Sequence, residues 1–270
     1  MTKEQRQERD LEIIELIKTK SQKEIGQMFG ITQSRVGVIL KKNGIKLSKG
    51  RLNMSKLGLD VQYFNNIDTK EKAYWLGFIC ADGYISRSGG KLSIIVKDKE
   101  ICEKLKRDIK SEHKISFREN YDKRTNKVYS EYFYQITNAV FVSHIIDKGV
   151  TNTKNKHLEF PSMDEAFYSY FIAGMFDGDG SISIKSSGSI GCSLISSKEV
   201  LDFIQEYFFN KFGIKPKPLI QVSENCENIF RIHWQSISDC KKVLDYIYQG
   251  DNIYLSRKYE KYKQYFGEQR

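Results

Sequence analysis

Apolar and polar positions repeat with two different periods along this chain of 270 residues, and the change of period divides it. Before residue 46, apolar residues recur only at helical spacing. The first helical stretch carries Leu11, Ile14 and Ile17, and another carries Val36, Ile39 and Leu40. From about residue 60, helical stretches are interspersed with runs in which apolar and polar residues alternate, as is typical of strands. The pattern predicts an all-α module at residues 1–46 and an α+β body.

Helix-start and helix-stop signals define the front module more closely. Ser21 and Glu24 have the spacing of a capping box, Gly30 ends the helix they open, and Thr32 caps another. Two short helices around a tight turn are typical of a helix-turn-helix unit that binds DNA. In that unit the exposed start of the last helix faces base edges and its end reaches phosphates, which assigns Gln33, Ser34, Arg35, Lys41 and Lys42. A three-helix bundle that binds nothing is the alternative. Residues 47–59 follow as a basic linker.

The body contains an internal repeat with an offset of 97 residues, over which Gly77 matches Gly174 and Asp82 matches Asp179. The first copy spans residues 60–161 and the second 162–270. Each copy has the element order α-β-β-α-β-β-α, with its later strands expected at 113–118, 132–137, 218–223 and 229–234. We expect an α+β fold with two pseudo-symmetric halves that form a saddle of antiparallel sheets.

Small residues four positions apart mark the helix that opens each copy. They are Ala73, Gly77 and Ala81 in the first helix and Gly174 and Gly178 in the second. A stripe without side chains lets two helix backbones approach closely, so we expect these helices to pack together. Gly83 and Gly180 are expected to end the helices in the left-handed conformation.

Asp82 and Asp179 are the last acids of the two helices, where the helix dipole disfavours negative charge by up to about 1 kcal/mol. Pairing the helices brings the two carboxylates together, and like charges at short range resist joint ionisation. A divalent cation reverses this cost, because Mg²⁺ binds carboxylate and carbonyl oxygens and water. For one copy alone, a capped core helix with a solvated aspartate is an equal alternative; two copies in register favour a shared metal site.

The segments WLGFICADG (75–83) and IAGMFDGDG (172–180) resemble the LAGLIDADG signature, and the doubled motif resembles the single-chain LAGLIDADG homing endonucleases over residues 60–270. The resemblance implies a monomer that makes a double-strand break in a long asymmetric DNA site by metal-dependent hydrolysis. It implies that Asp82 and Asp179 bind Mg²⁺, with Mn²⁺ or Ca²⁺ able to occupy the same sites, and that the carbonyls of Ala81 and Gly178 assist. The first motif departs from the signature at Cys80, a position that is usually structural, so we expect activity to be retained.

The resemblance also implies a basic residue near each metal, which we assign to Lys154 and Lys258. Such a group would stabilise charge on the scissile phosphate and favour hydroxide. Lys156 competes with Lys154 for the role, and Arg257 is a candidate partner of Lys258. An ordinary exposed lysine is the alternative for each.

Strand alternation separates the faces of the sheets. Ile85, Ile182 and Ile184 are expected to point inward. An outward face of polar and basic side chains suits the major groove, where they bind base edges and phosphates. The candidates for this face are Tyr84, Ser86, Arg87, Ser93, Lys97, Arg118, Gln135, Ser181, Ser183, Lys185, Arg231 and His233. For any one of them, a solvated position is the alternative.

The charge of the chain indicates a polyanion partner, and its composition indicates an intracellular location. The net charge is +10, and residues 1–56 carry 13 basic against 6 acidic residues, whereas the remainder carries 31 against 28. This positive charge suits double-stranded DNA as a partner. The alternative is that it reflects only a Lys-rich, solvated surface. The five cysteines are scattered without metal-ligand spacing, which indicates reduced thiols in the cytoplasm or an organelle. No apolar run is long enough for a membrane span or signal peptide.

Two other functions fit the same fold. The resemblance extends to relatives that act as transcription regulators without cutting DNA and to maturases that assist intron splicing. The presence of both acids, Asp82 and Asp179, favours the nuclease over these alternatives.

Overall fold

A computed structural model describes residues 3–17, 20–43, 45, 58–123, 125–153, 157–223 and 227–267. Residues 47–57 of the expected linker lie outside the described residues, so the domain boundaries stay a prediction.

The front module consists of helices α1 (Lys3–Leu16), α2 (Gln22–Met28) and α3 (Gln33–Lys42). The expected caps are present: Glu24 N donates to Ser21 Oγ (3.2 Å), Ser21 N donates to Glu24 Oε2 (2.7 Å), and Arg35 N donates to Thr32 Oγ1 (3.2 Å). The module has its own small core, which consists of Ile13, Ile17, Ile25, Val36, Ile39 and Leu40. Leu11, part of the apolar stripe at helical spacing, is 66% exposed and lies outside this core.

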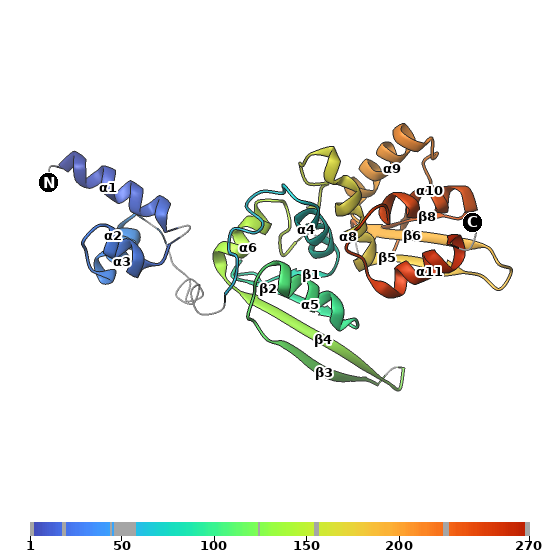
Figure 1. Ribbon diagram of the computed structural model, residues 1–270, viewed down its shortest axis with the longest axis horizontal. Coiled ribbons are helices and arrows are strands. Elements are labelled where there is room, and N and C mark those ends of the chain that lie inside the picture. The colour runs from blue at the N-terminus through green and yellow to red at the C-terminus, as the bar shows by residue number, and fades with distance from the viewer. Residues whose placement is uncertain are drawn as a thin grey trace.

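The body contains the two expected αββαββα halves, which confirms the predicted fold class (Figure 1). The first half comprises α4 (Lys70–Asp82), β1 (Gly83–Ile85), β2 (Lys91–Val96), α5 (Lys99–Asp108), β3 (Ile115–Asp122), β4 (Lys127–Thr137) and α6 (Ala139–Ile146). The second comprises α8 (Tyr168–Asp179), β5 (Gly180–Ile184), β6 (Ile190–Ser196), α9 (Lys198–Phe212), β7 (Ile220–Gln221), β8 (Phe230–Trp234), α10 (Ile237–Ile247) and α11 (Ser256–Phe266), after a 3₁₀ turn at Glu165–Phe167. Each half forms a four-stranded antiparallel sheet, in the orders β1-β2-β4-β3 and β5-β6-β8-β7.

Helices α4 and α8 lie side by side between the two sheets, and the core is continuous across them (Figure 1). Their large side chains, Trp75 and Phe78 on α4 and Phe171 and Phe176 on α8 among them, are buried. Burial of such side chains is worth about 1.5–3 kcal/mol each, so the helix pair is the main apolar support of both halves.

The contact between these helices is made through glycines, as the small-residue spacing predicts. A Cβ on Gly77 would lie 2.0 Å from the carbonyl oxygen of Phe171, and one on Gly174 would lie 2.0 Å from the carbonyl oxygen of Tyr74. Atoms cannot approach this closely, so any side chain here would force the helices apart.

Gly83 and Gly180 end the helices, but not in the expected left-handed conformation. Their φ angles are −73° and −85°, and the chain passes directly from each helix into an extended strand. Glycine is required for steric reasons instead: a Cβ on Gly83 would lie 2.6 Å from Ile79 Cγ2, and one on Gly180 would lie 2.4 Å from the carbonyl oxygen of Phe176.

The two sheets differ at their outer strands. Strands β3 and β4 pair over eight residues and extend beyond the predicted ranges, into a part of the hairpin where Tyr121 and Val128 are exposed. Strand β7 is only two residues long. Helix α11 was not predicted as a separate element, because its sequence is rich in Lys and Tyr and has no aliphatic stripe at helical spacing. Its buried face is instead formed by Tyr259, Tyr262 and Tyr265, which pack against the core.

None of the described helices is both long enough and apolar enough to cross a membrane.

We predict that Gly77→Ala lowers the free energy of unfolding by about 3 kcal/mol or more, because overpacking against backbone cannot be relieved by a rotamer change. Denaturant unfolding followed by circular dichroism measures the effect. Gly90→Ala is the matched control, since the nearest atom to its Cβ would be Ser88 Oγ at 3.9 Å. Equal stability of the two variants would contradict the close helix contact.

Candidate active site and nucleic-acid interface

The helix pair places the ends of the two motifs against each other. Asp82 is the last residue of α4 and is half-buried, and Asp179 is the last residue of α8 and is exposed. A Cβ on Gly178 would lie 2.4 Å from Ala81 Cβ and 3.5 Å from Asp82 Oδ2. The residue that precedes Asp179 is therefore packed directly on Asp82, and the helix ends converge as the sequence predicts.

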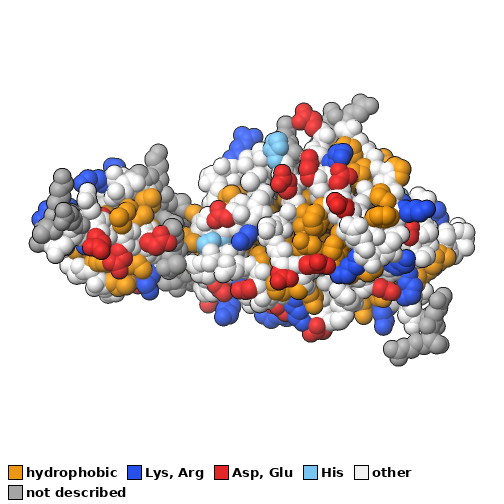
Figure 2. All heavy atoms as spheres, turned by 90° about the horizontal axis from the view of Figure 1, so that it is seen from above, with side chains coloured by type: hydrophobic (Ala, Val, Ile, Leu, Met, Phe, Trp, Pro, Cys, Tyr) orange, Lys and Arg blue, Asp and Glu red, His pale blue; other side chains and the backbone are white. Residues whose placement is uncertain are grey.

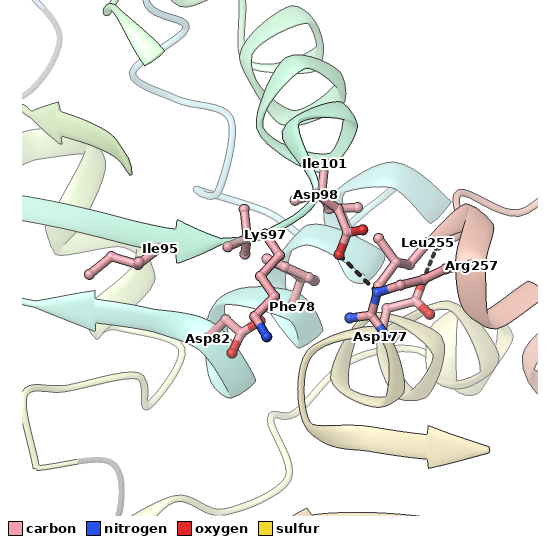
Figure 3. Close-up of a pocket in the computed structure, with 10 residues that line it drawn as sticks. Phe78, Asp82, Ile95, Lys97, Asp98, Ile101, Asp177, Leu255 and Arg257 are labelled. Atoms are coloured by element: carbon pink, nitrogen blue, oxygen red, sulfur yellow. Dashed lines mark hydrogen bonds and ion pairs between the residues drawn. The ribbon is translucent and has the colours of Figure 1, made fainter. Parts of the chain in front are cut away.

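A hollow of about 480 Å³ opens beside Asp82, between the end of β2 and the starts of α5 and α11 (Figure 3). Its polar lining residues are Asp82, Lys97, Asp98, Asp177 and Arg257, and its apolar ones are Phe78, Ile95, Val96, Ile101 and Leu255. Arg257 Nε donates to Asp98 Oδ2 at 2.9 Å. Two cationic side chains therefore line the space next to a carboxylate.

Lys258 belongs to the first turn of α11, and its side chain packs against the carboxyl end of α8, where it is only 4% exposed. Its Nζ donates to the carbonyl oxygens of Phe176 (2.7 Å), Asp177 (2.8 Å) and Gly178 (3.3 Å). A cation at the carboxyl end of a helix is stabilised by the helix dipole. The alternative of an ordinary exposed lysine is therefore wrong for this residue.

Burial lowers the pKa of Lys258 to about 8. The negative charges of Asp177, then Asp82 and Asp179, act against this lowering and favour the ammonium form. Lys258 thus interacts with both motif acids and reduces the repulsion that their convergence creates.

Asp177 is a buried carboxylate that joins the two repeats. Its Oδ2 accepts from the hydroxyl of Tyr74 on α4 (2.8 Å) and from the backbone N–H of Leu255 ahead of α11 (2.7 Å). Its Oδ1 has no hydrogen-bond partner within the described part of the chain. Burial raises the pKa of Asp177 from 3.8 to about 6, with the bond from Tyr74 and the charge of Lys258 acting in the opposite direction.

The donor set at the helix ends fits a hard cation such as Mg²⁺. Asp82 and Asp179 supply two carboxylates, and Mg²⁺ is usually held by one or two carboxylates with water or phosphate completing its shell. The described residues contain no group of three His, Cys, Asp or Glu side chains that could hold a metal, so a closed protein cage of the zinc type is absent from them. The carbonyl of Gly178, an expected ligand, is shared with Lys258.

Other site residues were assigned incompletely from the sequence. Lys154 and its competitor Lys156 lie outside the described residues. The sequence did not predict that Asp98 takes part in the site, because Asp98 follows a strand without a recognisable motif. It also did not predict the buried hydrogen bond of Asp177, because the partner, Tyr74, is 103 residues away. Arg257 was named only as a partner of Lys258, whereas it is paired with Asp98.

The sheets present matching rows of polar side chains. Strand pairing aligns Tyr84 with Ser93 and Ser93 with Gln135 in the first sheet. In the second sheet the corresponding row is Ser181, Ser193 and His233. Gln135 Nε2 donates to Ser93 Oγ (2.9 Å), and the hydroxyls of Ser181 and Ser193 are 2.9 Å apart. Ser193 was missed, although strand alternation places it opposite Ser181.

The outward assignment of the remaining residues is mixed. Tyr84 is 57% exposed, and exposed or half-buried positions are also held by Ser86, Arg87, Lys97, Gln135, Ser181, Ser183, Lys185, Arg231 and His233. Ser93 is 8% exposed beneath Gln135, and Arg118 is exposed but ion-paired with Glu131 (3.2 Å). Ile184 shares the face of buried Ile182 but is 39% exposed, because it is the last residue of its strand.

The second sheet has a shallow hollow of about 150 Å³ on this polar face. Its lining residues include Ser181, Ser183, Lys185, Ser193 and His233. On the face that Figure 2 presents, which is the α9 side of the molecule, acidic and basic side chains are interspersed with hydrophobic ones. The body therefore offers no uniform basic field on that side. In the front module Gln33, Ser34, Arg35, Lys41 and Lys42 are all exposed, and their role stays a prediction.

Comparison with known proteins agrees with this geometry. Residues 166–248 match the family described as the LAGLIDADG-like domain. The match lies within the second repeat, and the two αββαββα halves have the LAGLIDADG α+β fold. Among curated proteins, none matches the chain significantly.

Solved structures share the fold at low sequence identity. The homing endonuclease I-WcaI bound to its DNA recognition sequence is 13% identical, with a TM-score of 0.51, over 79% of this chain and 94% of that one. The N-terminal LAGLIDADG domain of DUF199/WhiA is 15% identical, with a TM-score of 0.46, over 72% and 90%. I-DmoI in complex with DNA and Ca is 12% identical, with a TM-score of 0.46, over 75% and 98%. Likeness at this level shows the fold alone.

We predict that Asp177 makes stability depend on pH. Its pKa is raised in the folded protein, so its contribution is fully present below pH 4 and is lost as pH rises through about 6. Asp177→Asn cannot titrate, so the free energy of unfolding of this variant relative to the parent should increase between pH 4 and 7. The increase should be on the order of 2–3 kcal/mol, since one pKa unit corresponds to about 1.4 kcal/mol.

Urea unfolding in metal-free buffer at the two pH values measures this difference. Asp202→Asn, which changes an exposed carboxylate on α9, is the control. A difference between the Asp177 variant and the parent that stays constant with pH would contradict the buried, titrating carboxylate.

Proposed function

We propose that this protein is a site-specific DNA endonuclease of the homing type, which cuts both strands of a long asymmetric duplex as a monomer. The observation that carries the proposal is the convergence of Asp82 and Asp179 at two helix ends, where each carboxylate opposes the helix dipole and the other acid. Folding alone does not favour that arrangement, whereas binding of a divalent cation does. The DNA bound by I-WcaI, a protein of the same fold, supports double-stranded DNA as the partner.

Asp82 and Asp179 would hold Mg²⁺, which when bound supplies charge for the scissile phosphates and activates water. The chain's own residues provide the surroundings. Lys258 holds positive charge beside both acids, and Lys97 and Arg257 line the hollow next to Asp82, where a phosphate would lie. The polar rows Tyr84–Ser93–Gln135 and Ser181–Ser193–His233 would contact base edges, and the front module would bind flanking DNA.

A DNA-binding protein that does not cut is the second candidate. It is favoured by the hydrogen bond from Lys258 Nζ to the carbonyl of Gly178, because this ammonium group competes with a metal cation for that oxygen. The LAGLIDADG domain of DUF199/WhiA shows that the fold is shared beyond proteins named as homing endonucleases. The two candidates differ in one property, which is cleavage in the presence of Mg²⁺.

We predict that Asp179→Asn and Asp82→Asn each strongly slow cleavage while the protein still binds its target. The amide keeps the size of the side chain but removes the charge that the cation requires. Loss of a group that stabilises transition-state charge costs on the order of a hundredfold to a thousandfold in rate. Single-turnover cleavage of duplex recovered from a selected library, with gel-shift binding in Ca²⁺, measures both properties.

Asp202→Asn serves as the charge-matched control and should cleave like the parent, because Asp202 is an exposed partner of Lys198 on α9. Normal cleavage by Asp179→Asn would contradict the assignment. Binding by the parent protein without any cut in Mg²⁺ or Mn²⁺ would support the non-catalytic candidate instead.

We predict that Gln135→Ala weakens binding to the selected target by about 1–3 kcal/mol, because a side-chain amide that reads a base edge contributes that much. Binding to unrelated duplex should change little, since phosphate contacts dominate there. Gln249→Ala is the control, at an exposed position next to the loop that pairs with the start of α4. Equal losses on target and unrelated DNA would exclude Gln135 from sequence readout.

A further inference from the structure

Exposed apolar side chains interrupt the polar outer face of each sheet. In the first sheet Ile95 is 43% exposed, although its neighbour Ile94 is buried in the core. In the second sheet Ile220 is 57% exposed on the edge strand β7. An antiparallel sheet that covers a core with one face normally has polar residues on the other. Single exposed apolar residues are common, so the positions of these two within the sheets decide whether they have a role.

Strand pairing places the two residues in equivalent rows of the two sheets. Ile95 on β2 is opposite half-buried Phe133 on β4. In the second sheet half-buried Ile195 on β6 is opposite Arg231 on β8, and Arg231 is opposite Ile220 on β7. We call Ile95 with Phe133, and Ile195 with Ile220, the apolar rows. Both repeats therefore have two apolar side chains at the same level of the face that points away from the core.

The apolar rows lie beside the polar rows, on the side of the motif acids. Ile95 is two residues beyond Ser93 on β2, which is about 7 Å along the same face. Strand β1 begins directly after Asp82 and pairs with β2 from Ile94 backwards. Ile95 therefore lies on the Asp82 side of Ser93, and it lines the hollow beside that acid (Figure 3). The second sheet repeats this register, because β5 begins directly after the second motif and pairs with β6 from Leu194 backwards.

Basic side chains border the apolar rows. Arg118 Cζ lies 5.3 Å from the centre of the Phe133 ring, and Lys97 Nζ lies 5.3 Å from the centre of the Tyr129 ring farther along the same face. In the second sheet Arg231 lies within the row itself. A stable protein partner would bury about 800 Å² on each side, far more than two side chains between cations provide. A polyanion that presents small apolar groups fits this surface better.

The major groove of DNA presents one methyl group to such a row, which is the C5-methyl group of thymine. The other groups that identify the bases there are hydrogen-bond donors and acceptors, which match the polar rows. An aliphatic side chain in contact with the methyl group removes apolar surface of both partners from water. This contact favours thymine over a base that lacks the methyl group.

We propose that the apolar rows read thymine methyl groups, with Ile95 as the contact in one half of the DNA site and Ile220 as the contact in the other. The proposal rests on the proposed DNA-reading function of the sheets. Because the apolar rows lie on the side of the motif acids, these thymines lie closer to the centre of the site than the bases read by Gln135 and His233. No covalent step is involved.

The test replaces thymine by deoxyuridine, which removes the methyl group and keeps every hydrogen-bonding atom of the base. Duplexes that the full-length protein retains in Ca²⁺ are selected from a randomised library, and dissociation constants of singly replaced duplexes are measured by fluorescence anisotropy. For the parent protein, at least one replacement in each half should weaken binding by about threefold to fivefold, the loss expected for one buried methyl group.

Substitution of the two contacts should remove this effect half by half. Ile95→Ser should abolish the effect of uracil in one half only, and Ile220→Ser should abolish it in the other half only. Ile95→Val keeps an apolar contact and should keep the effect. Ile237→Ser is the matched control, because Ile237 is exposed at the start of α10, outside both sheets, and should leave both halves unchanged. Gln135→Ala should relax the base preference farther from the centre than the thymine read by Ile95.

Replacements that change binding by less than about 1.5-fold at every thymine, or effects that persist in both Ser variants, would overturn the proposal. A selected target that lacks thymine in the inner part of one half would overturn it as well. Should Ile95→Ser fail to fold by circular dichroism, Ile220→Ser decides by the same measurement. Binding in Ca²⁺ requires no cleavage, so a methyl effect without any cut in Mg²⁺ would defeat the nuclease proposal alone. Retention of no duplex would defeat both.

Discussion

The rest of the structure depends on the direct contact between the backbones of α4 and α8. Gly77 and Gly174 lie against carbonyl oxygens of the opposite helix, with no room for a Cβ on either side. The contact joins the cores of two sheets that have no strand pairing with each other. It also sets the helix ends in register, so that Gly178 packs on Asp82 and the last acids of both motifs converge. A steric constraint near the middle of the helices thereby determines the electrostatics at their ends.

The convergence of the two motif acids brings like charges together, and the nearby charge of Lys258 offsets part of their repulsion. Lys258 caps the carbonyls of α8 and lies within reach of both motif acids, and Asp177 holds the segment that carries it. The first motif has Cys80 in place of this acid. The outer strands differ as well, because the β3–β4 hairpin is long and β7 is short. The two repeats therefore differ at a buried motif position and in the length of their outer strands.

Much of this was accessible from the sequence, because the repeat constrains it twice. The spacing of Gly77, Gly174 and Gly178 predicted the helix contact, and the offset of 97 residues predicted two equivalent sheets. The conformation of Gly83 and Gly180 was predicted wrongly, since a helix that continues directly into a strand needs no left-handed residue. The bond between Tyr74 and Asp177 and the pair of Arg257 with Asp98 could not be predicted, because they join distant segments through side chains without a periodic signal.

A metal-dependent nuclease centre at the paired helix ends can be tested by incubating the protein with a randomised duplex library and Mg²⁺ and sequencing all new DNA ends. Double-strand ends are expected at one long sequence, and none when Asp82 and Asp179 are both changed to Asn. Retention of a specific duplex without any new ends, or ends that persist in the doubly substituted protein, would contradict it.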